Sequence, residues 1–192
     1  MFFLVCFMEL DKVIKERHCV RRFKSAKPDY AKILEAVDAA RKVPLAGNIP
    51  SLKFMLVTDK DKINELAQAA TQDFVSSVHY VLVVCSNSTN CVRSYGDRGE
   101  LYTLQQAGAA IQNFLLKLTD LKLSTCWVGA FSDKTVKRVL KIPYHVRVEG
   151  LFPIGVEMGK GKQRTKPSLD SSIYFNTWGT KTLTPVRKPE AG

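Results

Sequence analysis

Hydrophobic and polar positions follow recognisable periods through the first third of the chain. Apolar residues at i, i+3 and i+4 predict a short helix over residues 9–16. A second helix is predicted to open at Pro28 and to end before Pro44, because proline fits the start of a helix but breaks its interior. The apolar run over residues 53–58 predicts a strand, and helical spacing resumes after Asp59.

The rest of the chain holds the two longest apolar patterns. Residues 79–85 are nearly all apolar and rich in β-branched side chains, which predicts a strand buried on both faces. Helical spacing over residues 100–122 predicts a long, largely buried central helix. The other predicted elements are a loop over residues 86–98, a strand over residues 124–131, a helix from Asp133 that stops before Pro143, a strand over residues 146–156 that Pro153 interrupts, and a basic, extended segment beyond Gly159.

These elements predict an α+β fold in which helices flank a mixed central β-sheet. No internal repeat and no Pro/Ser/Gly-rich linker divides the chain, so residues 1–192 are expected to form one domain. Within it, residues 1–8 would be an N-terminal extension and residues 159–192 a basic, extended tail. Because such tails are too polar and too long to pack on their own subunit, we expect them to wrap a partner in a symmetric dimer.

The first residues of the chain are apolar, but the run is too short for a membrane-spanning helix, which needs about 20 residues. It also lacks the basic flank and the small-residue cleavage site of a signal peptide. Either Met8 is the natural start and residues 1–7 are an upstream extension, or the run is a strand or arm that packs on a partner subunit. No membrane association is predicted.

Cysteine usage bears on the compartment. The five cysteines are an odd number at irregular spacing, with no C-x-x-C pair, which excludes a disulfide framework and a zinc site. The three histidines form no H-E-x-x-H motif, so no metal is predicted. A reducing cytoplasm is the simplest location.

Charge adds a candidate binding function. The formal net charge is +11, from 29 Lys and Arg against 18 Asp and Glu, which fits nucleic acid, an anionic membrane or a small anionic ligand. Residues 17–23 (RHCVRRF) concentrate three arginines and a histidine directly after the first predicted helix. A guanidinium group can bind two phosphate oxygens at once and stays protonated, so this segment is a candidate anion-binding site. Taken alone, such a run is more often an exposed basic face.

The common nucleotide-binding loops are missing. No G-x-G-x-x-G follows a predicted strand. Residues 155–162 (GVEMGKGK) break the P-loop spacing and have no Ser or Thr after the lysine. A nucleotide-like cofactor would therefore have to bind without a Rossmann turn or a Walker loop.

Six short segments occur in a characteristic order. They are 17–23 (RHCVRRF), 44–48 (PLAGN), 95–99 (YGDRG), 109–113 (AAIQN), 125–131 (TCWVGAF) and 153–155 (PIG). Each segment is weak alone, but in this order they resemble the FMN-dependent nitroreductase family over about residues 8–178. The resemblance implies a nitroreductase-like fold and a domain-swapped homodimer with FMN at the interface between its subunits.

The resemblance also implies roles for individual residues. Arg17 and His18 would bind the FMN phosphate or ribityl chain, and Arg21 would lie near the N1–C2=O edge of the ring, where a cation stabilises reduced flavin. Asn48 would hydrogen-bond the ring, and a backbone N–H from Gly129 would point at flavin N5.

Four further positions complete the implied cofactor site. Cys19 stands where the family has serine, so its side chain is a weaker donor, although its backbone N–H remains. Val128 would lie against the ring in the strand that leads to Gly129. Arg164 and Lys166 would clamp the phosphate from the basic tail.

The implied reaction passes hydride from NADH or NADPH to flavin N5 and then to a nitro compound, a quinone or a similar small-molecule acceptor. Use of one open face for both steps predicts ping-pong kinetics, and no catalytic side chain is expected. Two alternatives remain. One is a specialised flavoenzyme of the same fold, such as a dehalogenase or a flavin-fragmenting enzyme. The other is a basic nucleic-acid-binding protein, which is disfavoured because the aromatic residues are not interleaved with the basic runs.

Overall fold

The structure, a computed structural model, describes residues 9–159, 161 and 165–182. The chain forms two units, Met1–Gly161 and Lys162–Gly192. Every described strand, and every described helix except the last, belongs to the first unit. The second unit begins close to the predicted start of the basic tail and contains the four-residue helix α7 (Leu169–Ser172).

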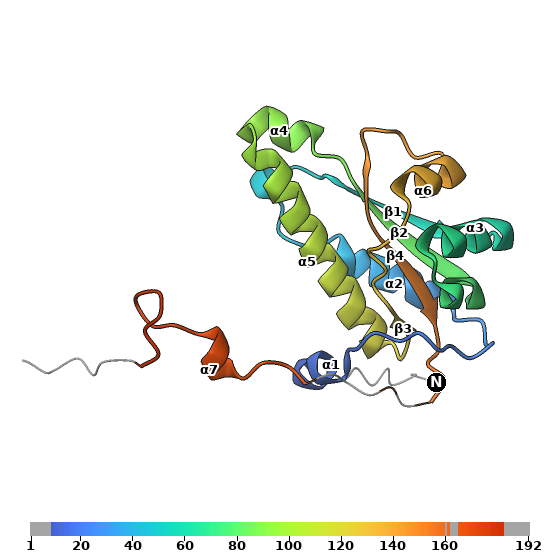
Figure 1. Ribbon diagram of the computed structural model, residues 1–192, viewed down its shortest axis with the longest axis horizontal. Helices are drawn as coiled ribbons and strands as arrows, with labels where there is room; N and C mark the ends of the chain where they lie inside the picture. The colour runs from blue at the N-terminus through green and yellow to red at the C-terminus, as the bar shows by residue number, and fades with distance from the viewer. Residues whose placement is uncertain (1–8, 160, 162–164, 183–192) are drawn as a thin grey trace, which may run out of the picture. The chain divides into compact units, whose positions relative to one another are not determined.

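A four-stranded sheet forms the centre of the first unit, in the order β1-β2-β4-β3 (Figure 1). Its strands are β1 (Leu52–Val57), β2 (Tyr80–Ser86), β3 (Ser124–Thr125) and β4 (Arg147–Gly155). The predicted α+β class is confirmed, but all pairings among the described strands are antiparallel, so the sheet is not mixed. A continuous apolar strand such as β2 is typical of parallel sheets, whereas here helices bury both faces of an antiparallel one.

Helices cover both faces of this sheet (Figure 1). One face carries Leu82 and Phe152 and packs against α2 and α5, whereas the other carries Val83 and Leu151 and packs against α3 and α6. The helices of the first unit are α1 (Leu10–Glu16), α2 (Tyr30–Ala40), α3 (Lys60–Ala70), α4 (Thr89–Tyr95), α5 (Arg98–Asp120) and α6 (Asp133–Leu140), with 3-10 turns η1 (Ala46–Asn48) and η2 (Asp73–Ser77).

Side-chain caps determine where three of these helices begin. Asp29, Asp59 and Ser132 each accept a hydrogen bond from a backbone N–H in the first turn of the helix that follows. The predicted starts of α2 and α3 are therefore confirmed. In α6 the capping side chain is Ser132, and Asp133 is the first helical residue.

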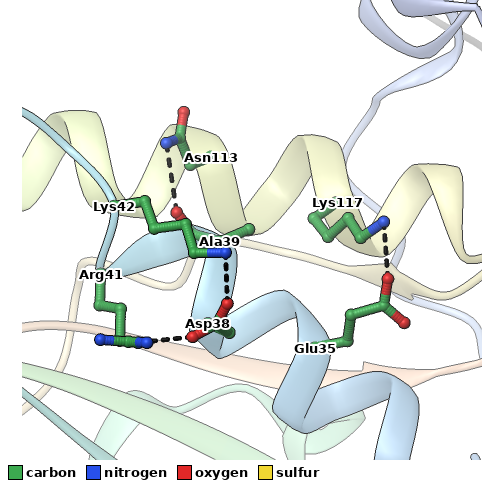
Figure 2. Close-up of polar contacts among 7 residues, drawn as sticks. All are labelled: Glu35, Asp38, Ala39, Arg41, Lys42, Asn113 and Lys117. Carbon is green, nitrogen blue, oxygen red and sulfur yellow. Dashed lines mark hydrogen bonds and ion pairs between the residues drawn. The ribbon is translucent and has the colours of Figure 1, made fainter.

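The long helix α5 is joined to α2 by polar contacts as well as by apolar packing (Figure 2). Asn113 Nδ2 donates to the carbonyl oxygen of Ala39 at 3.3 Å, and Lys117 Nζ lies 2.8 Å from Glu35 Oε1. Asn113 belongs to the AAIQN segment, so this part of the motif holds two helices together.

One predicted loop is a helix. Residues 86–98 contain α4, whose one buried residue is Cys91, so the helix has too few apolar positions to give a periodic signal. Gly99 lets α5 start directly against the backbone of α4, because a Cβ at Gly99 would collide with the backbone of Cys91 and Val92.

Strand β3 is shorter than predicted, and Pro153 does not interrupt β4. After the two residues of β3, pairing resumes only at Val128, which exchanges two backbone hydrogen bonds of 3.0 Å with Leu151. Backbone groups of alternate residues in β4 point to opposite neighbours, so the nitrogen of Pro153 faces the same side as the N–H of Leu151. There it lies opposite residues 126–127, which do not pair with β4. The N–H that proline lacks is therefore not needed for a ladder hydrogen bond.

Candidate functional site

The basic segment over residues 17–23 is fixed along the edge of the sheet. Val20 N–H donates to the carbonyl oxygen of Thr125 at 3.0 Å, and Phe23 pairs with Glu157 in an isolated antiparallel bridge. The side chains of Val20 and Phe23 are buried. These contacts hold the backbone in place while the basic side chains of the segment stay accessible.

A pocket of about 290 Å³ opens beside this segment, with Cys19, Arg21 and Arg22 on one wall and Glu157 on the other. Arg21 lies over the ring of Phe74, with its guanidinium carbon 5.9 Å from the ring centroid. None of the three arginines of residues 17–23 forms an ion pair with a described residue. Unpaired guanidinium groups around a small pocket make it suitable for an anion.

His18 is held between two oxygen acceptors. Its Nδ1 lies 2.7 Å from the carbonyl oxygen of Glu16, and its Nε2 lies 3.0 Å from Glu157 Oε1. Burial lowers the pKa of His18, but these two hydrogen bonds raise it by more, so the pKa of His18 is above its usual value. A carbonyl oxygen and a carboxylate both accept, so the doubly protonated ring satisfies both contacts, which is why they favour the cationic form of His18.

This pairing changes the predicted role of His18. Both of its ring nitrogens are already used, and Gly161 N–H also donates to Glu157 Oε1 at 2.8 Å. A phosphate could therefore reach the His18 side chain only by displacing one of these contacts. The net positive charge of the pocket comes instead from the arginines.

Cys19 lines the pocket and lies next to the buried Cys126, whose thiol donates to the carbonyl oxygen of Trp127 at 3.9 Å. The contact with Cys126 lowers the pKa of Cys19 to about 5 against the opposing effect of burial. The backbone N–H of Trp127 and the charges of Arg17 and Arg21 lower it further. The same contact with Cys19 raises the pKa of Cys126. The thiolate form of Cys19 is therefore favoured.

The two strand residues expected near the ring have different backbone contacts. Val128 uses both its N–H and its C=O with Leu151, and its side chain is buried, so Val128 offers a ligand no polar group. Gly129 is exposed, and its N–H donates to no acceptor among the described residues. Gly129 also borders a second pocket of about 580 Å³, together with Phe131 and His145. The accessible N–H of Gly129 is compatible with the predicted role.

Asn48 is not brought to the basic segment. It lies in η1, where Gly47 packs against the hydroxyl of Tyr95, shortly before the start of α5. The basic segment instead pairs with Thr125, shortly after the end of α5. Because the 23 residues of α5 span roughly 33 Å, the two predicted parts of the site are at opposite ends of this helix (Figure 1).

The two predicted tail residues are not joined to the site by the structure. Arg164 lies outside the described residues. Lys166 belongs to the second unit and is exposed. Their role as a phosphate clamp stays a prediction.

Sequence reasoning missed two residues of this site. Glu157 is an acid in a basic stretch and carries no local signal for its pairing with a histidine 139 positions away. Cys126 stands in the TCWVGAF segment, but its contact with Cys19 depends on the pairing of Val20 with Thr125. Both contacts are long-range, so the sequence offers only the residue types.

No helix in the described part of the chain is long and apolar enough to cross a membrane.

Comparison with known proteins gives a consistent family. The sequence matches the nitroreductase family over residues 14–80 and 70–156. It is 37% identical over 100 residues to a putative nitroreductase of Methanocaldococcus jannaschii, a match that covers 52% of this chain and 50% of that protein. It is 25% identical over 200 residues to a putative NAD(P)H nitroreductase of Streptococcus pyogenes, covering 87% of this chain and 98% of that protein.

Solved structures support the same grouping. A nitroreductase family protein from Clostridium novyi NT is 30% identical with a TM-score of 0.72, covering 90% of this chain and 96% of that one. The NADPH:FMN oxidoreductase from Vibrio harveyi complexed with NAD+ has a TM-score of 0.79 at 20% identity, covering 88% and 77%, and shows the fold alone. The predicted family and the predicted enzyme class, oxidoreductase, are confirmed. The chain belongs to the nitroreductase family.

Proposed function

We propose that this protein is an FMN-dependent oxidoreductase that transfers hydride from NADH or NADPH to a nitro compound, a quinone or a similar small-molecule acceptor. The observation that carries the proposal is the pocket at residues 17–23, which Arg21 and Arg22 line without an acidic partner among the described residues, in a nitroreductase family fold. Relatives named NAD(P)H nitroreductase and NADPH:FMN oxidoreductase support the choice of cofactor and hydride donor.

The residues present fit the phosphate and ring of FMN. Arg17 and Arg21 supply fixed positive charge near the pocket, and backbone N–H groups of the same segment supply further donors. The exposed Gly129 N–H supplies a donor without an acceptor, and the absence of a Cβ leaves open space there. A donor aimed at an atom that gains negative charge stabilises the reduced state.

When bound, FMN would supply the hydride chemistry, accepting hydride at N5 and passing it on. The protein's own part is to bind and orient. Arg17 would hold the phosphate, Arg21 would stabilise the ring edge that gains charge on reduction, and the Gly129 N–H would donate to N5. No side chain needs to act as a nucleophile or as an acid–base pair. Donor and acceptor would use one open face in turn, so parallel lines are expected in double-reciprocal plots.

A homodimer is part of the proposal. Asn48 is too far from the basic segment of its own chain to reach the same flavin, so a second subunit would have to supply it. The end of the molecule that carries Asn48 also exposes Tyr95, Leu101 and Leu104, which are 40%, 47% and 37% accessible. Burial of these apolar side chains against a second copy would stabilise a dimer.

A cytoplasmic location is proposed as well. The described cysteines, Cys19, Cys85, Cys91 and Cys126, are all free thiols, as expected in a reducing compartment.

Titration of the purified chain with FMN tests the proposal. We expect saturable binding with quenched flavin fluorescence, followed by anaerobic bleaching of the flavin absorbance by NADH or NADPH. A chain that binds no FMN but binds oligonucleotides with a steep salt dependence would show that the basic segment serves nucleic acid.

A further inference from the structure

Two thiols from distant parts of the sequence lie side by side next to the pocket that Cys19 lines. Cys19 is exposed, whereas Cys126 is 1% accessible. The backbone N–H of Val20 donates to the carbonyl oxygen of Thr125 at 3.0 Å, which places the adjoining residues Cys19 and Cys126 opposite each other. The pair therefore has one member that a small molecule can reach and one that is held directly behind it.

The surroundings of the pair favour a charged sulfur at Cys19. Residues 126–127, opposite Pro153, lie outside the ladder, and the backbone N–H of Trp127 lowers the pKa of Cys19. Arg17 and Arg21 add positive charge close by. Thiolates in electropositive, accessible sites are the reactive form of cysteine.

We propose that Cys19 and Cys126 form an oxidisable dithiol, in which a hydroperoxide oxidises Cys19 and Cys126 then closes an intramolecular disulfide. The proposal rests on the contacts between these residues and holds whether or not the pocket binds FMN.

The chemistry balances in two steps. The Cys19 thiolate attacks the distal oxygen of the hydroperoxide, so an S–O bond forms, the O–O bond breaks, and the alkoxide or hydroxide that leaves takes a proton from water. The Cys126 sulfur then attacks the resulting sulfenic acid. An S–S bond forms, the S–O bond breaks, and the departing hydroxide takes the Cys126 proton to give water. Two thiols are oxidised and one hydroperoxide is reduced.

The other described thiols provide internal controls. Cys85 is buried in β2, and burial raises its pKa to about 11. Cys91 is fully buried in α4. Neither side chain is accessible, so neither should react at the rate of Cys19.

The test treats the full chain with hydrogen peroxide, alkylates the remaining thiols after denaturation, and maps the peptides by mass spectrometry. We expect one disulfide, between Cys19 and Cys126, which dithiothreitol reverses and which runs as a monomer on a non-reducing denaturing gel. Cys85→Ser should form the same bond. Oxidation of Cys85 or Cys91 before Cys19, or a bond only between two chains, would overturn the proposal.

Variants separate the two roles. Cys126→Ala should stop the reaction at the sulfenic acid, which dimedone traps at Cys19, and Cys19→Ser should leave Cys126 reduced. Loss of the Cys126 thiol should also slow alkylation of Cys19 by iodoacetamide at pH 6 by roughly tenfold, since the lower thiolate fraction outweighs the higher intrinsic nucleophilicity. An unchanged alkylation rate would show that Cys126 does not activate Cys19.

Discussion

The two ends of α5 differ in chemistry. Beyond its C-terminal end lie the arginines of residues 17–23 and the pocket that they border. At its N-terminal end lie Asn48, Tyr95 and exposed leucines, with no cluster of positive charge comparable to residues 17–23. Under the proposed function each end would hold only part of the flavin site, and the site would be complete only where the charged end of one subunit meets the apolar end of another.

Removal of the phosphate-binding charge should have the largest effect. Arg17→Ala is expected to weaken FMN binding by roughly 10- to 100-fold, because charge-assisted hydrogen bonds contribute about 1.5–3 kcal/mol. Arg22→Ala is the comparison variant; Arg22 also lines the pocket, but the proposed role of Arg17 predicts a change below about threefold when Arg22 is removed. The measurement is FMN titration by flavin fluorescence. Equal losses in the two variants would mean that the phosphate lies nearer to Arg22.

Mixed dimers test the division of the site between the two ends. Asn48→Ala alone should weaken FMN binding by about 2- to 10-fold, as expected for one neutral hydrogen bond. A heterodimer of one Arg17→Ala subunit and one Asn48→Ala subunit should hold one site of wild-type affinity and one that carries both losses.

The outcome distinguishes a shared site from a site within one chain. If Arg17 and Asn48 of the same chain served one flavin, no site in the heterodimer would keep wild-type affinity. Differently tagged subunits, purified through both tags, allow the two sites to be counted by biphasic FMN titration.

The charge of Cys19 should have a smaller effect at the same end. Its thiolate offsets part of the positive charge of Arg17 and Arg21, so Cys19→Ala and Cys19→Ser are both expected to bind FMN about 3- to 10-fold more tightly at pH 8. The advantage should shrink toward pH 5, where the wild-type sulfur becomes protonated. Tighter binding by the serine variant alone would mean that hydroxyl donation matters more than charge.

The sequence best predicted the features that depend on residues close together in the chain, such as helix starts and buried strands. The starts of α2 and α3 follow from Asp29 and Asp59, and the buried strand β2 follows from its own apolar run. It predicted the site as residue types in motifs, but not the contacts between segments. The pairing of Val20 with Thr125 joins residues more than 100 positions apart, and no local pattern encodes it.

The separation of Asn48 from the basic segment shows the same limit. The motifs name both parts, yet only the packing of η1 and of residues 17–23 at opposite ends of α5 shows that one chain cannot bring them together. Helix α4 was missed for a related reason. It packs against α5 through a single buried residue, which is too few to give a helical pattern of hydrophobic positions.

The smallest expected effect concerns the pair of His18 and Glu157 that closes the charged end. The pKa of His18 is raised in the folded state, so its contribution to the free energy of unfolding is fully present below its unfolded pKa, about 6.5, and is lost as pH rises through the folded pKa. Glu157→Gln should therefore cost about 0.5–1 kcal/mol at pH 6 and less at pH 9. Urea denaturation at the two pH values measures this difference. The control is Glu9→Gln, because Glu9 is an exposed N-cap residue of α1 whose side chain makes no capping hydrogen bond. A cost that is equal at both pH values would mean that His18 is neutral in the folded protein and that Glu157 acts through its hydrogen bond from Gly161 N–H alone.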